Sequence, residues 1–361
     1  MRFTRKALAL TVALLAGASA AAIGAVRAAD GVATGDTSTK KIAFSNSYAG
    51  NSFRQVMIKS FEDEAAKAKA AGKIGGSTVA SSNNSVTEQA SQIQNLILQG
   101  YEAIIVLAGS DTALNGAIKD ACDAGIVVVA FASGVTEPCA YVVDYNLDSY
   151  AKAELDFIAS KLGDKPANIL EIRGMAGDGF DKRLNAGVNK ALAAHPSYKK
   201  VGEVYGQWTG TVAQKEVSGI LPSLPQIDAV LTQGGDGYGA AQAFKAANRP
   251  LPIIVMGNRQ DELALWKKEH DATGYEIFSL GATPSVSQVA FWVAQQILAG
   301  KKVPKFVEVP LLQINQPDLG AWLKTVPEGG VVNAEYTQDL VAKIIDANVD
   351  KTALPMPAAP K

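Results

Sequence analysis

The chain has 361 residues, and its 34 lysines and arginines almost balance its 35 aspartates and glutamates. This near-neutral charge, without a basic run in the body of the chain, excludes the positive surface that nucleic acid binding requires. With only two cysteines and two histidines, the sequence contains no pattern of metal ligands, and we expect no metal and no cofactor.

The first 29 residues have the layout of an export signal. Basic residues at positions 2–6 precede an apolar run from Ala7 to Ala22, and small side chains around Ala28 suit cleavage. The run of about 16 residues is shorter than the ~20 that a membrane-spanning helix needs. No cysteine follows it to carry a lipid. We therefore expect a signal peptide at 1–29 and a soluble mature protein in the periplasm.

Cys122 and Cys139 are the only cysteines of the chain. Cys122 lies near a predicted helix end, and Cys139 follows Pro138 in a loop that could fold back over it. In an oxidising compartment the pair is a disulfide candidate, worth about 3 kcal/mol through chain entropy. Two small buried hydrophobic residues are the alternative.

From residue 41 the sequence alternates between short β-rich runs and helical stretches, a pattern typical of parallel sheets covered by helices. In the first half we expect helices at 51–72, 85–100 and between 111 and 125. Ser85 and Glu88 form a capping-box pattern at the second of these helices. The predicted strands are 41–47, 77–84, 102–110, 126–131 and 140–146.

The same alternation starts again after residue 148. Helices are predicted at 149–163, 183–196, 211–224 and 238–248, with strands at 168–174, 201–208, 229–235 and 253–258. A last helix at 285–300 and a strand at 306–315 are too short for a third domain, so we expect the chain to cross back to one lobe.

The sequence thus predicts an α/β protein of two Rossmann-like lobes with parallel sheets, joined by a multi-strand hinge with a ligand cleft between them. We expect an N-terminal lobe from 40–144 plus 283–311 and a C-terminal lobe from 145–282 plus 312–348. The stretch before residue 40 is expected to be a flexible leader, and 349–361 a disordered tail.

Four segments together carry a family resemblance: the turn Asn51–Phe53 after the first strand, residues 82–129, the segment that ends at Gln233, and residues 282–290. Through them, residues from about 40 to 314 resemble the periplasmic sugar-binding proteins of ABC importers, of the ribose-binding, galactose-binding and lactose-repressor-core type. It implies two lobes that close on a sugar, with aromatic rings against its apolar faces and polar side chains on its hydroxyls.

The same resemblance implies site residues in both lobes. In the first lobe, Tyr48, Asn51 and Phe53 belong to the ligand-facing turn, and Arg54 stands at a neighbouring aromatic position. An arginine there would replace a stacking wall by a hydrogen-bond fork and favour a ligand with a more polar edge or an anionic group. The alternative is an Arg54 that points to solvent.

In the second lobe, Trp208 matches the aromatic residue that stacks on the sugar. The second-lobe arginine of the family falls at Lys182 or Arg183, and both remain candidates. The further candidates there, near polar positions of the family, are Asp236, Asn258 and Arg259.

Other positions depart from the ribose-binding pattern. The Asp-Arg pair that ends a first-lobe strand is here Ala132 and Ser133, and the hinge glutamine is Ala282, next to Thr283. These changes remove a carboxylate, a guanidinium and a carboxamide. The identity of a pentose or hexose ligand therefore does not carry over.

The sequence lacks the motifs and residues that a catalytic function would need. The glycine-rich turn from Gly235 to Gly239 follows a strand but misses the spacing of a dinucleotide site and carries an aspartate at the diphosphate position. His195 and His270 do not sit at strand ends, and Asp178 and Asp181 are expected to serve a helix cap and the surface. We expect no enzyme.

The expected function is an exported, monomeric solute-binding component of an ABC transporter. It would trap a sugar or polyol and deliver it to a permease of the inner membrane. A sensor that presents its ligand to a chemoreceptor and, less favoured, a nucleoside- or dinucleotide-binding protein are the alternatives.

Overall fold

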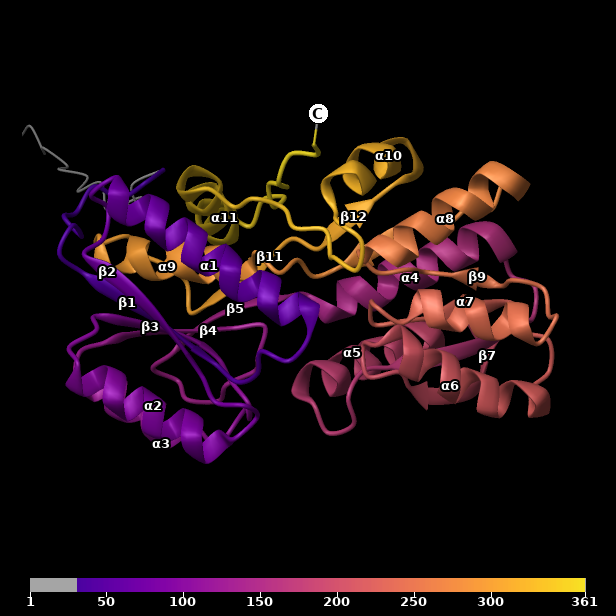
Figure 1. Cartoon of the computed structure of the whole chain (residues 1–361), viewed down its shortest axis with the longest axis horizontal. Coiled ribbons are helices and arrows are strands. Elements are labelled where there is room, and N and C mark those ends of the chain that lie inside the picture. Colours follow the sequence, from indigo (N-terminus) through magenta and orange to yellow (C-terminus); the bar gives the residue numbers. More distant parts are fainter. Residues whose placement is uncertain (1–30, 361) are drawn as a thin grey trace, which may run out of the picture.

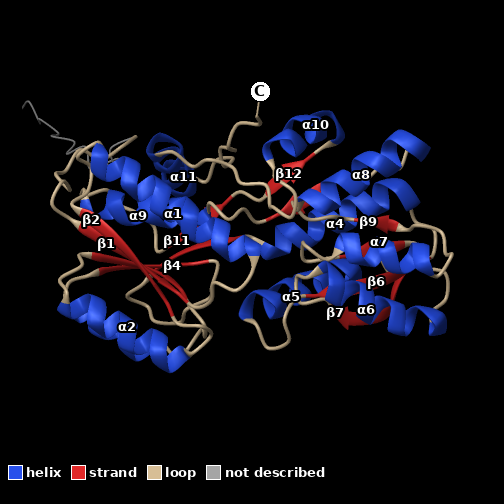
Figure 2. Cartoon of the chain, in the orientation of Figure 1, coloured by secondary structure: helices blue, strands red, loops and turns tan. Residues whose placement is uncertain are grey.

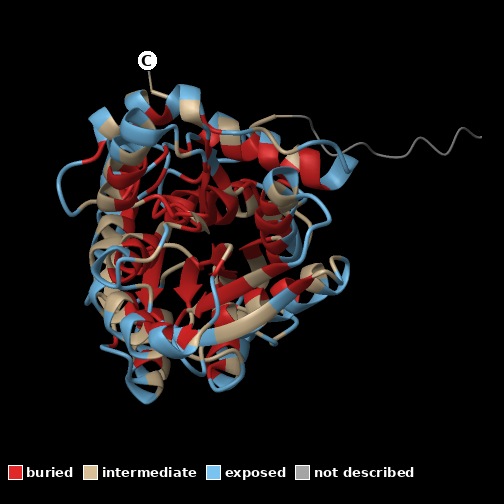
Figure 3. Cartoon of the chain, turned by 90° about the vertical axis from the view of Figure 1, so that its right-hand side faces the viewer, coloured by how far each residue is buried: buried red, intermediate tan, exposed pale blue. Residues whose placement is uncertain are grey.

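A computed structural model describes residues 31–360 of the chain. The predicted signal peptide at 1–29 lies outside the described residues. Two α/β lobes lie side by side along the long axis of the molecule (Figures 1 and 2). Buried residues lie in the interior of the molecule, and exposed residues lie on its outer surface (Figure 3).

The N-terminal lobe is built on a six-stranded parallel sheet of order β11-β5-β4-β3-β1-β2. Its central strand β3 reads AIIVL and is buried throughout, as expected for a parallel strand covered on both faces. The strands are β1 (Lys41–Asn46), β2 (Gly76–Ser81), β3 (Ala103–Leu107), β4 (Val127–Phe131), β5 (Tyr141–Tyr145) and β11 (Phe306–Val309).

Helices cover both faces of this sheet (Figure 1). α1 (Ser52–Ala70) packs against α9 (Val286–Leu298), and α2 (Val86–Leu98) packs against α3 (Asn115–Asp123) on the opposite face. Ser85 caps α2 by accepting a hydrogen bond from the Glu88 backbone at 3.2 Å, whereas the Glu88 carboxylate accepts from the Gln92 side chain.

The C-terminal lobe contains a four-stranded parallel sheet of order β7-β6-β8-β9. A two-stranded antiparallel pair, β10 (Ser279–Gly281) with β12 (Leu312–Ile314), lies beside it through a bridge between Met256 and Ser279. The parallel strands are β6 (Ala167–Arg173), β7 (Tyr198–Tyr205), β8 (Ala229–Leu231) and β9 (Ile253–Ile254).

The helices of this lobe pack as neighbours in the chain, α4 on α5 and α6 on α7. α8 and α10, which we did not predict, also pack together. The bounds are α4 (Leu147–Leu162), α5 (Gly179–Ala193), α6 (Gly210–Ile220), the 3-10 turn η1 (Leu221–Ser223), α7 (Gly237–Ala246), α8 (Gln260–Thr273) and α10 (Gln316–Thr325).

The hinge consists of chain segments that pass between the lobes. They join β5 to α4, β10 to α9, β11 to β12, and α10 to the last helix (Gln338–Asp350). The single strand expected at 306–315 is therefore two strands in different sheets. Pro310 lies between them, and its missing N–H ends the ladder of β11.

The last helix corrects the expected lobe boundaries. α11 (Gln338–Asp350) packs on α9 and β11 of the N-terminal lobe, and the Asn348 amide pairs with both backbone groups of Glu308 at 2.8 and 3.0 Å. The expectation that 312–348 belongs to the C-terminal lobe is therefore wrong for α11, which also includes the first two residues of the expected tail. Its apolar stripe is visible in the sequence, but the stripe does not reveal which lobe it covers.

The described part of the leader is packed, contrary to expectation. The backbone of Gly31 donates to Asp346 at 2.9 Å, and that of Ala33 donates to Gln296 at 2.7 Å. These bonds attach residues 31–40 to α9 and α11. Within residues 31–360, no helix has the length and apolarity to cross a membrane.

The predicted disulfide is confirmed. Cys122 at the end of α3 is bonded to Cys139 in the loop before β5, with an Sγ–Sγ distance of 2.10 Å and a sequence separation of 17. The bridge holds the α3 side of the N-terminal lobe and leaves the hinge free.

Candidate functional site

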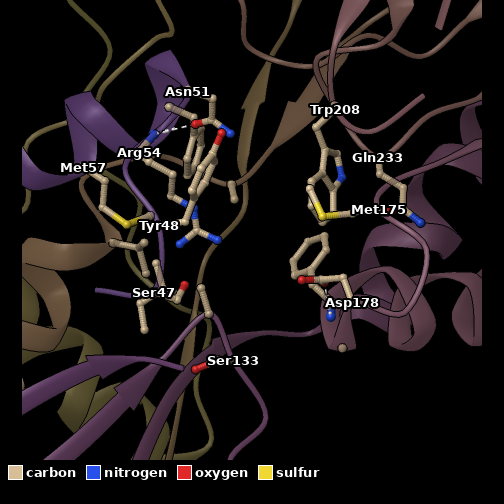
Figure 4. Close-up of a pocket in the computed structure, with 18 of the residues that line it drawn as sticks. Ser47, Tyr48, Asn51, Arg54, Met57, Ser133, Met175, Asp178, Trp208 and Gln233 are labelled. Carbon is tan, nitrogen blue, oxygen red and sulfur yellow. Dashed lines mark hydrogen bonds between the residues drawn. The ribbon is translucent and has the colours of Figure 1, made fainter. Parts of the chain in front are cut away.

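A cavity of about 670 Å³ lies between the lobes and is lined by side chains from both. The close-up in Figure 4 shows two facing walls. Ser47, Tyr48, Asn51, Arg54, Met57 and Ser133 form the N-terminal wall, and Met175, Asp178, Trp208 and Gln233 form the C-terminal wall.

The cavity lies at the carboxyl ends of the parallel strands, where α/β sheets bind their ligands. Ser47 follows β1, Asp111 follows β3 by a short loop, and Ser133 follows β4. In the other lobe, Asp178 follows β6 and Gln233 follows β8. Loops far apart in the sequence thus meet at one place because both sheets direct their carboxyl ends at the cleft.

The turn before α1 forms much of the N-terminal wall. Asn51 caps α1 by accepting a hydrogen bond from the Arg54 backbone at 2.9 Å, and Asn46 donates to the Tyr48 carbonyl at 2.8 Å. A Cβ on Gly50 would lie 2.0 Å from the Tyr48 hydroxyl, so a glycine is required for this ring position. Tyr48, Asn51, Phe53 and Arg54 all line the cavity, as expected.

Arg54 enters the cavity with unused hydrogen-bonding capacity. Its Nη1 atom is buried and has no hydrogen-bond partner among the described residues. Burial lowers the pKa of Arg54 to about 10, and the charge of Asp178 in the opposite lobe counteracts part of this effect. The guanidinium therefore stays charged at neutral pH.

Trp208 is the main aromatic group of the C-terminal wall. It has a positive φ of 52°, an unusual backbone conformation for a side chain of this size. Its ring occupies space that Gly174 leaves open, since a Cβ on Gly174 would lie 2.3 Å from the indole. The ring of Phe180 stands edge-on to it at a centroid distance of 6.4 Å.

Asp236 does not line the cavity, which corrects its expected place. It is fully buried behind the wall, where its Oδ1 accepts a hydrogen bond from the Thr209 backbone at 3.0 Å. Burial, assisted by the nearby Glu262 carboxyl, raises the pKa of Asp236 well above its usual value. Asp236 thus holds the loop that carries Trp208.

The structure also separates Lys182 from Arg183. Lys182 lines the interlobe cavity. Arg183 lies outside that cavity because its guanidinium pairs with the buried Asp144 of the N-terminal lobe, with 2.6 Å between Nη1 and Oδ2. Arg183 therefore connects α5 to the end of β5.

Asn258 and Arg259 line the cavity as expected. The Nδ2 atom of Asn258 is buried without a hydrogen-bond partner among the described residues. The Arg259 guanidinium donates to Ser52 of α1 at 3.2 Å and to the Trp208 carbonyl at 3.1 Å. Arg259 therefore ties the start of α8 to the other lobe.

The departures from the ribose-binding pattern also lie in the cavity wall. Ala132, Ser133 and Ala282 line it, and Ala132 has a positive φ of 46°. The Ser133 hydroxyl accepts from the Ala108 backbone at 3.2 Å and donates to the Phe131 carbonyl at 3.1 Å. Small side chains thus stand where the family pattern has a carboxylate, a guanidinium and a carboxamide.

Several lining residues were missed from the sequence. Asp178 caps α5, as expected, but also faces the cavity. Asp181, expected at the surface, is fully buried and forms an ion pair with Arg173 at 2.6 Å. The position of polar residues at the carboxyl ends of predicted strands could have identified the other missed members Ser47, Ser110, Asp111 and Gln233.

The glycine-rich turn after β8 serves packing. A Cβ on Gly239 would lie 1.8 Å from the Gly210 carbonyl oxygen, so the glycine permits the close approach of α7 to α6. The Glu262 carboxylate accepts hydrogen bonds from the backbones of Gly235, Gly237 and Gly257 at 3.2, 2.9 and 3.2 Å. A carboxylate thus occupies the backbone donors that a diphosphate would need.

A cavity between two parallel-sheet lobes that a hinge joins defines a two-lobed solute-binding protein. The family model described as periplasmic binding protein domain matches residues 42–302, and the chain belongs to this family. The fold and the family predicted from the sequence are thereby confirmed.

Named relatives agree with this assignment. The chain is 32% identical to the xylitol-binding protein of Mycolicibacterium smegmatis over 51% of this chain and 53% of that protein, about half the length of each. It is 26% identical to the ribose import binding protein RbsB of Bacillus subtilis over 64% of this chain and 75% of that protein.

A solved structure matches almost the whole described chain. The ABC transporter solute binding protein from Thermobispora bispora superimposes with a TM-score of 0.80 and 34% identity, over 89% of this chain and 99% of that one.

Proposed function

We propose that this protein is the exported solute-binding component of an ABC importer, which encloses a sugar or polyol between its lobes and delivers it to a membrane permease. The observation that carries the proposal is the interlobe cavity, with polar groups from both lobes and an aromatic wall from the second. The names of the relatives, which specify xylitol and ribose, support this class of ligand.

Different side chains of the cavity would recognise the apolar and the polar parts of such a ligand. Trp208 and Phe53 offer faces against which the C–H side of a sugar or polyol packs. Asn51, Arg54 and Asn258 offer hydrogen bonds, and the buried, unpartnered Nη1 of Arg54 and Nδ2 of Asn258 need acceptors that a hydroxyl can provide.

Closure of the lobes supplies the mechanism. Contacts from both walls exist together only when the lobes are close, so the ligand shifts the population toward the closed form by its differential affinity. In this structure the two lobes are in contact beside the cavity, because Arg259 donates to Ser52 and the Asp111 carboxylate lies against Gly179. The permease would recognise the closed surface, and the protein would act as a soluble periplasmic monomer without catalysis.

A thermal-shift screen tests the proposal. Sugars, polyols and sugar acids are compared with NAD and nucleosides, using the chain from Asp30 onward. A ligand at ~1,000 times its dissociation constant adds about 4 kcal/mol and raises the melting temperature by roughly 6 °C. A rise confined to a nucleoside or dinucleotide would contradict the proposal.

A further inference from the structure

The charges of the interlobe cavity are unequal. Its lining contains three cationic side chains, Arg54, Lys182 and Arg259, and two carboxylates, Asp111 and Asp178. The cavity therefore has a formal excess of one positive charge, and its three cations differ in their partners within the protein.

Arg259 is already engaged, because its guanidinium donates to the Ser52 hydroxyl and the Trp208 carbonyl. Lys182 is exposed on α5, where water can solvate its ammonium group. Arg54 differs from both. Its Nη1 is buried, and among residues 31–360 no carboxylate lies within ion-pairing distance of its guanidinium.

The two carboxylates of the cavity are balanced from the C-terminal lobe. Asp178 caps α5, with its Oδ1 accepting from the backbones of Phe180 at 2.7 Å and Asp181 at 3.2 Å. The Asp111 carboxylate approaches Gly179 at the same helix start, where a Cβ would lie 2.7 Å from it. The positive end of the α5 dipole stabilises both charges. Asp178 attracts Arg54 across the cavity, but no carboxylate of the described residues forms an ion pair with it. Arg54 is thus left as a half-buried cation without an ion-pair partner.

A neutral polyol would satisfy the hydrogen bonds of this guanidinium but leave its charge uncompensated. A carboxylate would satisfy both, since its two oxygens match the fork of a guanidinium in a bidentate pair. A buried cation gains most from such a partner, because an unpaired charge is costly away from water.

We propose that the solute carries a carboxylate that Arg54 binds as a bidentate pair, which makes the preferred ligands sugar acids of the aldonic or uronic type. This inference rests on the proposed function, since it names the ligand class of the same cavity. Trp208, on the facing wall, would pack against the hydroxylated carbon chain.

The test is calorimetric titration with matched pairs of solutes: xylonate against xylitol, gluconate against sorbitol, and glucuronate and galacturonate against glucose and galactose. We expect at least one acid to bind about 30-fold more tightly than its neutral counterpart. Arg54→Gln should remove most of this preference, and Arg54→Lys, which keeps the charge without the fork, should lie between. Lys215→Gln, on the exposed side of α6, is the control for loss of one positive charge.

The outcomes are distinguishable. Neutral solutes that bind as tightly as their acids would overturn the carboxylate and leave the proposed function intact. An acid preference that survives in Arg54→Gln would overturn the assignment to Arg54. Binding of no sugar, polyol or sugar acid would contradict the proposed function itself.

Discussion

Trp208 is the residue on which the proposed ligand stacking depends, and its neighbours hold it in an uncommon conformation. Gly174 leaves room for the indole, and Asp236 fixes the following backbone N–H of Thr209. The positive φ of Trp208 strains the backbone locally, and the surrounding contacts offset this strain.

Trp208→Ala should reduce ligand affinity by a factor of about 100 or more, because a buried aromatic anchor contributes most of the energy at its wall. The fold should remain, since the ring faces the cavity and not the lobe interior. Titration with the best ligand and circular dichroism of the same sample check both parts. Unchanged affinity would remove Trp208 from the site.

Glu154, on α4, predicts a pH dependence of stability. Its carboxyl is fully buried, and burial raises its pKa well above the usual 4.5. An acid whose pKa is raised in the folded state binds more protons folded than unfolded. The free energy of unfolding therefore falls as pH rises from the unfolded pKa through the folded pKa.

Glu154→Gln removes this ionisation, so the free energy of unfolding of the variant should fall less than that of the wild type between about pH 5 and pH 8. At pH 8 the variant should be more stable than the wild type by about 1 kcal/mol. Urea unfolding at both pH values measures this, with the exposed Glu62→Gln on α1 as the control. The same loss of stability in both proteins would show that the pKa of Glu154 is not raised in the folded state.

At the scale of elements, the disulfide joins the end of α3 to the loop before β5. Cys122→Ala with Cys139→Ala should lower the free energy of unfolding by about 3 kcal/mol through the entropy of the unfolded chain. Ligand affinity should not change, since neither residue lines the cavity. A large loss of affinity would show that the bridge shapes the site.

Sequence patterns predicted most elements of the two sheets because their strands are short apolar runs between turn residues. They missed α8, where charged residues from Gln260 to Thr273 dilute the apolar stripe, and the brief strand β10. They also predicted neither α10 nor α11 as a helix, and they assigned residues 338–348 to the wrong lobe, because the apolar stripe of α11 fits either lobe. Periodicity fixes an element and its buried face, whereas the partner of that face depends on contacts distant in the sequence.

In the site, too, local features were predicted and contacts distant in the sequence were not. Tyr48, Asn51, Phe53, Arg54 and Trp208 were predicted as cavity residues through a family resemblance, and the structure places them in the cavity wall. Their roles in binding stay predictions. The interaction of Asp236 with Thr209 and that of Arg183 with Asp144 could not be predicted, because each joins segments that only the fold brings together.

At the scale of the whole molecule, the lobes approach each other at Gly179. A Cβ there would lie 2.7 and 2.9 Å from the Asp111 carboxylate oxygens, so an added side chain would displace the Asp111 carboxylate from its contact with the other lobe. Gly179→Ala should therefore hinder closure and reduce ligand affinity roughly 10-fold, since population of the closed form sets the apparent affinity.

The matched control is Gly116→Ala on α3, where an added Cβ would meet no atom within 4 Å. Titration of both variants with the same ligand makes the comparison. Equal affinities in the two variants would show that closure does not require the contact between Asp111 and Gly179.

The central claim is that a small polar solute binds between the lobes. A crystal structure of the mature protein with the solute that gives the largest thermal shift tests this most directly. The account predicts electron density in the interlobe cavity, packed against Trp208 and in hydrogen-bond contact with Arg54. Density elsewhere on the molecule, or a ligand that leaves both residues untouched, would contradict it.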